Sequence, residues 1–105
     1  MWLPLAEQNN AESQFNLGVM YDQGKGVPHS GMRAFKWYKL SAEQGYPKGQ
    51  FNLGEIYREG VILTRDFEKA LKWYRLSAEK GLAEAQCNLG LMYAEGQGTQ
   101  KNYKE

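Results

Sequence analysis

The chain has 105 residues, of which 42% are hydrophobic and 24% are charged, which suits one modest folded domain rather than a disordered segment or a membrane span. Thirteen Lys and Arg residues stand against twelve Asp and Glu, and a net charge of about +1 gives no electrostatic reason to expect nucleic acid or a membrane as a partner. The single cysteine, Cys87, excludes an internal disulfide.

A unit of 36 residues recurs along the chain. QFNLGVMY at 14–21 returns as QFNLGEIY at 50–57 and as QCNLGLMY at 86–93, and 16 of the 36 positions of 11–46 are identical in 47–82. We therefore expect a single repeat domain over 1–105. Its parts are the end of a preceding repeat (1–10), two repeats (11–46 and 47–82) and a partial repeat (83–105).

Residues 1–10, MWLPLAEQNN, align with the second half of the repeat, so they are interpreted as the end of a second helix. The segment contains neither a basic stretch nor a long apolar run, and a signal peptide is not expected. A cytoplasmic location is favoured on this basis. The alternative is that the chain is part of an exported bacterial protein.

The first helix of each repeat is predicted over 11–23, 47–59 and 83–95, because apolar or small residues recur there at helical spacing. A glycine follows the last turn of each, where a left-handed residue is favoured: Gly24, Gly60 and Gly96.

The second helix is predicted over 31–44 and 67–80. Residues that commonly cap helix N-termini precede these positions in each repeat: Ser30, Asp66 and Asn102. The residues expected to end the second helices are Gly45, Gly81 and, at the N-terminus, Asn9.

Each first helix contains an internal glycine at the same place, and such a glycine costs about 1 kcal/mol relative to alanine. The three are Gly18, Gly54 and Gly90. We expect a Trp or Tyr of a second helix to approach the backbone closely at these positions.

Two long motifs carry a family resemblance. LGVMYDQGKGVPHS…AFKWYKLSAEQG and LGEIYREGVILTRD…ALKWYRLSAEKG, followed by the partial copy LGLMYAEGQGTQKN, resemble the Sel-one-like repeat, a relative of the tetratricopeptide repeat. The resemblance covers 11–105 and implies an all-α fold, a right-handed α-solenoid superhelix of helix-turn-helix repeats. The chain departs from the family pattern at Ile62 in a loop, at Gly31 where an aromatic residue is usual, and at Ser41 and Ser77.

The resemblance also implies a non-catalytic scaffold or adaptor that binds a protein or peptide on its concave face. Asn16, Asn52 and Asn88 would then line the groove, and the alternative is that each forms a hydrogen bond with a loop of a neighbouring repeat. The candidate partner-binding residues on these helices are Glu12, Asn16, Val19, Gln23, Lys48, Asn52, Glu55, Glu59, Glu84, Asn88, Leu91 and Glu95. With Asp22 beside it, this surface is acidic and is expected to prefer basic or polar segments, unless it is an ordinary solvated face.

A basic series recurs on the second helices, and a solvated exterior is favoured there over a site for an anionic partner. Its members are Arg33, Lys36, Lys39, Lys69, Lys72 and Arg75. The apolar loop 61–63 is expected to fill space between the hairpins, the alternative being an exposed patch that meets a partner.

Cys87 aligns with Phe15 and Phe51, so a buried or half-buried thiol is expected rather than a nucleophile. His29 is the only histidine and supports neither a catalytic triad nor a zinc site. GKGVPHSG is not a phosphate-binding loop. No cofactor and no metal are therefore expected.

Two other functions stay open. One is β-lactam binding or hydrolysis, as in a cysteine-rich bacterial branch of the family, although the disulfide pairs of that branch are missing. The other is a structural spacer within a longer repeat array. The ends of the sequence also suggest head-to-tail or swapped association between copies, unless the chain is a fragment.

Overall fold

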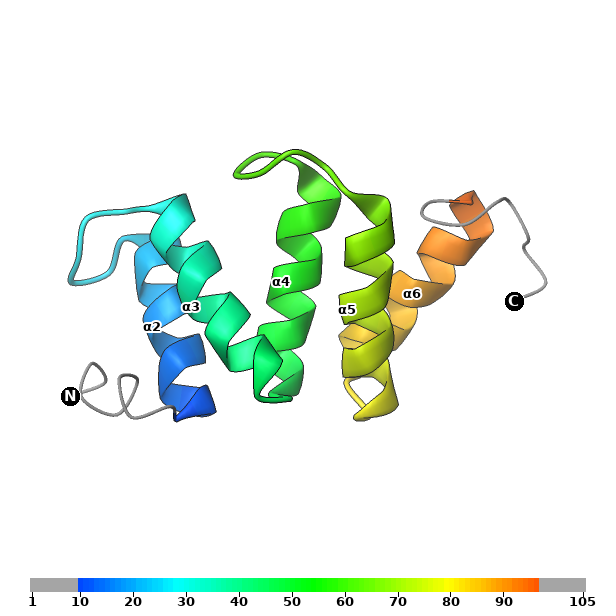
Figure 1. The fold of residues 1–105 in the computed structure, drawn as a ribbon, viewed down its shortest axis with the longest axis horizontal. Coiled ribbons are helices and arrows are strands. Elements are labelled where there is room, and N and C mark those ends of the chain that lie inside the picture. Colours follow the sequence, from blue (N-terminus) through cyan, green and yellow to red (C-terminus); the bar gives the residue numbers. More distant parts are fainter. Residues whose placement is uncertain (1–9, 97–105) are drawn as a thin grey trace.

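The computed structural model describes residues 10–96, and this part of the chain is entirely α-helical (Figure 1). The helices, each of 13 residues, are α2 (Ala11–Gln23), α3 (Gly31–Glu43), α4 (Pro47–Glu59), α5 (Phe67–Glu79) and α6 (Ala83–Glu95). The predicted all-α class and the first-helix ranges are confirmed. The second helices end one residue earlier than predicted. Asn9, Asn102 and the segment 1–9 lie outside the described residues.

The second helices begin at the predicted capping side chains, and the first helices end at the predicted glycines. The Ser30 hydroxyl accepts a hydrogen bond from the Arg33 amide at 3.2 Å, and an Asp66 carboxylate oxygen accepts one from the Lys69 amide at 3.1 Å. The residues that follow the first helices have φ values of 69°, 70° and 73°, at Gly24, Gly60 and Gly96. These left-handed conformations turn the chain back toward the second helix.

Each helix packs against the next one along the chain, and α2 also meets α4. The described helices form an elongated array with extents of 46 × 26 × 17 Å, with α4 lying between α3 and α5 (Figure 1). The hydrophobic core forms two clusters, each of which joins a hairpin to the first helix of the next repeat. One cluster is built on Ala34, Tyr38 and Ile56, and the other includes Leu71, Tyr74 and Met92. The right-handed superhelical sense stays a prediction.

A tyrosine of each second helix lies directly on the internal glycine of its first helix. A Cβ atom on Gly18 would stand 2.7 Å from the Tyr38 ring, and one on Gly54 would stand 2.9 Å from the Tyr74 ring. The predicted close approach is therefore confirmed in both repeats. Among the described residues, nothing lies within 4 Å of a Cβ on Gly90, and the repeat would place its equivalent tyrosine at position 110.

One buried serine joins the two helices of each hairpin. The Ser41 hydroxyl donates to the Ala11 carbonyl oxygen and the Ser77 hydroxyl donates to the Pro47 carbonyl oxygen, both at 2.8 Å. These serines stand where the related repeats commonly have alanine. The hydroxyl groups are satisfied, so their burial carries little desolvation penalty.

The loop between α4 and α5 explains two departures from the repeat pattern at once. The Ile62 side chain occupies the space over Gly31, where a Cβ would lie 2.8 Å from Ile62 Cγ1. Ile62 and Leu63 pack against the core of the first hairpin, as predicted for a plug between hairpins. Val61 is 83% exposed and does not take part.

Cys87 is exposed, so the expected buried or half-buried thiol is wrong. In the repeats before it, Phe15 and Phe51 pack on Tyr38 and Tyr74, with ring centroids 5.8 and 5.7 Å apart. The equivalent of these tyrosines for Cys87 lies beyond residue 105. No described second helix therefore covers this side of α6.

The glycine contact can be tested with two substitutions at equivalent positions. Gly54→Ala is expected to lower stability by about 1–3 kcal/mol, because its Cβ overlaps a buried ring. Gly90→Ala is expected to raise it by up to about 1 kcal/mol, since alanine favours the helix and meets no neighbour. Chemical denaturation of each variant measures the difference. If both substitutions stabilise the protein, close packing does not explain the conserved spacing of the glycines.

The Gly31 and Ile62 pair predicts strong coupling in a double-mutant cycle. Gly31→Phe and Ile62→Gly should each lower the melting temperature, the first by overlap with Ile62 and the second by loss of packing. One repeat further along the sequence, the equivalent positions hold Phe67 and Gly98, so the double variant reproduces the combination of residues found there. Its loss should be smaller than the sum of the single losses. Strictly additive losses would contradict the proposed compensation.

Candidate functional site

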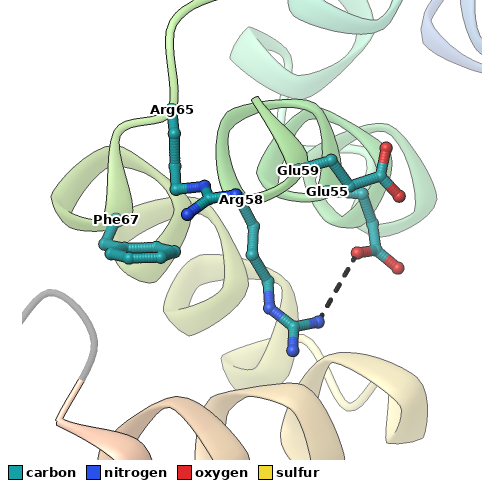
Figure 2. Close-up of a pocket in the computed structure, with 5 residues that line it drawn as sticks. All are labelled: Glu55, Arg58, Glu59, Arg65 and Phe67. Carbon is teal, nitrogen blue, oxygen red and sulfur yellow. Dashed lines mark ion pairs between the residues drawn. The ribbon is translucent and has the colours of Figure 1, made fainter. Parts of the chain in front are cut away.

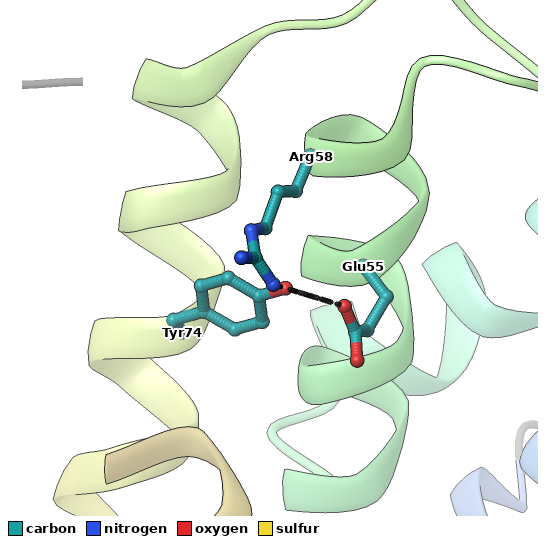
Figure 3. Close-up of polar contacts among 3 residues, drawn as sticks. All are labelled: Glu55, Arg58 and Tyr74. Atoms are coloured by element: carbon teal, nitrogen blue, oxygen red, sulfur yellow. Dashed lines mark hydrogen bonds and ion pairs between the residues drawn. The ribbon is translucent and has the colours of Figure 1, made fainter. Parts of the chain in front are cut away.

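The two packed tyrosines also organise polar groups on the first helices. The Tyr38 hydroxyl donates to an Asp22 carboxylate oxygen at 3.4 Å, and the Tyr74 hydroxyl donates to Glu55 Oε1 at 2.7 Å (Figure 3). Glu55 occupies the repeat position of Val19, whereas Asp22 occupies that of Arg58. The carboxylate partner therefore moves by one helical turn between repeats, while the tyrosine stays in place.

Asparagines of the following repeat meet the same hydroxyls. Burial raises the pKa of Tyr38 and of Tyr74, and side-chain hydrogen bonds from Asn52 and Asn88, respectively, oppose this rise. Asn52 and Asn88 thus each interact with a tyrosine of the preceding second helix. The equivalent contact of Asn16 would fall on residue 2, outside the described residues. A direct role of these half-buried amides in partner binding stays a prediction.

An acidic pocket lies between α2 and α4, with α3 behind it. Its volume is about 200 Å³ and its lining residues are Asp22, Tyr38, Asn52, Glu55, Ile56, Glu59 and Ile62. Three acidic residues from two adjacent repeats line this small space, and the lining includes no lysine or arginine. The acidic pocket can therefore accept a cationic group.

Glu55 and Glu59 also border a second pocket, of about 280 Å³, on the other side of α4 (Figure 2). Its remaining lining residues are Arg58, Arg65 and Phe67. Arg58 points toward Glu55, with 4.0 Å between Nη1 and Oε1, and Arg65 lies 5.3 Å from the centre of the Phe67 ring. Acidic and basic groups are mixed here, in contrast to the acidic pocket.

The carboxylates of the acidic pocket repel one another. Partial burial raises the pKa of Glu59, the negative charges of Glu55 and Asp22 raise it further, and Arg58 opposes the rise. Ionised Glu59 therefore destabilises the folded protein at neutral pH. Ionisable groups that lower folding stability in this way are common in binding sites.

The predicted partner-binding residues do not all meet at one place. The acidic pocket unites Asn52, Glu55 and Glu59, whereas Val19 packs against the core of the first hairpin. Lys48 lines a separate pocket beside Lys80 and Leu82. Of the remaining members, Asn16 and Asn88 are half-buried, and the others are exposed: Glu12, Gln23, Glu84, Leu91 and Glu95.

Sequence reasoning assigned Tyr38 and Tyr74 to packing and missed their polar role. The available signal was the hydroxyl itself, because phenylalanine would pack equally well at a buried position. A tyrosine in both repeats indicates that the oxygen has partners.

The described residues show no metal centre and no Cys–His pair. Within 10–96, no three side chains of His, Cys, Asp or Glu are arranged to hold a metal ion. Cys87 lies exposed on α6 and His29 is exposed in the loop after α2. None of the described helices has the length and apolar character required to cross a bilayer.

Comparison with known proteins identifies the repeat. The family model described as Sel1 repeat matches residues 11–46, 47–82 and 83–105. None of the curated proteins compared with the chain matches it.

Two solved structures are similar over most of the chain. A Sel1 repeat protein from Oxalobacter formigenes is 44% identical with a TM-score of 0.87, over 92% of this chain and 39% of that protein. A protective antigen of uropathogenic Escherichia coli strains, which displays an SLR fold, is 40% identical with a TM-score of 0.89, over 93% of this chain and 21% of the antigen. The chain thus spans less than half the length of either structure.

Glu59→Gln is expected to raise the melting temperature at pH 7. A carboxyl group with a raised pKa contributes stability below its ordinary value of 4.5 and loses that contribution as the pH rises through the folded-state pKa. The gain should therefore shrink at about pH 4, where the carboxyl group takes up its proton. Thermal unfolding at the two pH values measures this, with Glu43→Gln at the exposed end of α3 as the control. An equal gain at both pH values would show that charge repulsion is not the cause.

Proposed function

The chain belongs to the Sel1 repeat family, and on that premise we propose that it is a non-catalytic adaptor that binds a basic protein or peptide segment along α2, α4 and α6. Repeats of this family generally mediate contacts between proteins. The observation that carries the proposal is the acidic pocket between successive repeats.

The charges of the acidic pocket support a cationic ligand. Asp22, Glu55 and Glu59 line the same space, and the pKa of Glu59 is raised first by its partial burial and then by the charges of the other two. A lysine or arginine side chain entering the pocket would relieve this repulsion and gain charge-assisted hydrogen bonds. Binding would thus recover part of the stability that the free protein lacks.

The tyrosine and asparagine groups support a rigid site. The Tyr38 hydroxyl donates a hydrogen bond to Asp22, and the Asn52 side chain interacts with the same hydroxyl. Side chains that are already ordered lose little conformational entropy when a ligand arrives. The acidic pocket is therefore suited to recognise a cationic side chain rather than to adapt to many shapes.

The remaining acidic side chains of the first helices extend the proposed surface beyond the acidic pocket. Glu12, Glu84 and Glu95 are exposed, as is Gln23, and Asn88 repeats the position of Asn52. Leu91 is 46% exposed and offers an apolar contact on α6. A basic segment lying across several repeats would meet these groups in turn.

The lining of the acidic pocket favours binding over catalysis. It contains no serine, cysteine or histidine that could act as a nucleophile or paired base. The β-lactam alternative also lacks support, because one cysteine cannot form the disulfide pairs that the resemblance attributes to that branch.

Removing charge from the acidic pocket should weaken the binding of a basic peptide. The double variant Asp22→Asn and Glu59→Gln keeps the shapes of both side chains and removes two negative charges. We expect the Kd for a fluorescein-labelled arginine-rich peptide to rise roughly fivefold to twentyfold, as for the loss of two charge-assisted contacts. Isothermal titration calorimetry measures the change.

The matched control is Glu43→Gln with Glu79→Gln, which removes two exposed charges from the ends of α3 and α5. Its Kd should stay within about twofold of the parent protein, because these positions are solvated. If both variants weaken binding equally, the effect comes from the net charge of the protein and not from the acidic pocket. No binding by the parent protein would favour the spacer alternative.

A further inference from the structure

A second charged surface lies on the second helices, outside the proposed peptide-binding face. Three basic residues recur at equivalent positions of α3 and α5, and all of them are exposed. We call this set the basic face: Arg33, Lys36, Lys39, Lys69, Lys72 and Arg75. The sequence alone favours a solvated exterior for these residues, but two structural observations point to a different role.

The first observation is that the positive charges of the basic face are not neutralised by carboxylates. The ion pair found within residues 10–96 joins Arg58 to Glu55, and neither residue belongs to the basic face. Glu68 and Glu79 stand one helical turn from Lys72 and Arg75, where intrahelical pairs commonly form. No such pair forms there among the described residues, so these charges are available to a partner.

The second observation is that aromatic rings position five of the six cations. Lys36 lies 5.3 Å from the centre of the Trp37 ring, and Lys72 lies 4.8 Å from that of Trp73, 36 residues later. The other pairs are Arg33 on Tyr21, Lys69 on Tyr57 and Arg75 on Tyr93. A cation held over an aromatic ring loses less side-chain entropy on binding than a freely rotating one.

We propose that the basic face is a second interaction surface, which docks an acidic segment of a partner protein. Repeated, preset and unpaired cations are complementary to carboxylates spaced along such a segment. The net charge of the chain is near zero although this surface is basic, because acidic residues such as those of the acidic pocket balance its positive charge. The chain would then hold a basic segment on one set of helices and an acidic one on the other.

The surroundings of the basic face favour an acidic protein segment over nucleic acid. Glu43, Glu68 and Glu79 are exposed on the same two helices. These carboxylates would repel a continuous phosphate backbone, whereas a short segment with spaced carboxylates can lie between them. A net charge of about +1 also provides little long-range attraction for a polyanion.

Replacing the two tryptophan-positioned lysines tests the proposal. The variant Lys36→Gln with Lys72→Gln is compared with the parent protein for binding of a fluorescein-labelled glutamate-rich peptide by fluorescence anisotropy. We expect the Kd to rise roughly fivefold in the variant and binding of the parent to weaken as salt is added. A peptide with glutamine in place of glutamate should not bind.

The control Lys25→Gln with Lys80→Gln removes the same charge from exposed positions outside the basic face. Its affinity should stay within about twofold of the parent, and circular dichroism verifies that both variants fold. Three results would overturn the proposal: no binding of the acidic peptide, equal loss in both variants, or tighter binding of a labelled single-stranded oligonucleotide than of the peptide. None of these results bears on the basic-peptide assay of the acidic pocket.

Discussion

The structure depends on the contact between a tyrosine ring of the second helix and a glycine of the first. A Cβ atom at Gly18 or Gly54 would overlap the ring. The two helices of a hairpin therefore approach this closely only because glycine has no Cβ. The penalty for glycine within a helix is offset by the burial of a large aromatic side chain. The buried serines Ser41 and Ser77 add a hydrogen bond at the other end of each hairpin.

The same tyrosines connect packing to the surface chemistry. Once the ring lies on the glycine, its hydroxyl reaches a carboxylate of its own repeat and an asparagine of the next. The polar groups of neighbouring repeats are therefore aligned by a core residue. This link explains how the repeat can vary its exposed residues, as at Val19 and Glu55, while the position of the tyrosine is maintained.

Charge is distributed unevenly over a molecule that is nearly neutral. Carboxylates gather between the first helices, where partial burial and then mutual repulsion raise the pKa of Glu59, and cations without a carboxylate partner occupy the exposed side of the second helices. Within each arrangement the like charges repel one another. Two oppositely charged faces are instead suited to an adaptor that brings two partners together.

The sequence by itself determined the helices and their limits, because capping residues, left-handed glycines and a strict 36-residue period are local signals. It also indicated the close approach at Gly18 and Gly54, because a glycine that destabilises the helix in every repeat is expected to be offset by a packing contact. It did not reveal that Ile62 fills the space over Gly31, that Cys87 is exposed, or that Asp22 and Glu59 share a pocket. These features were decided by the tertiary structure, because each depends on how one hairpin is placed against the next, which no local pattern encodes.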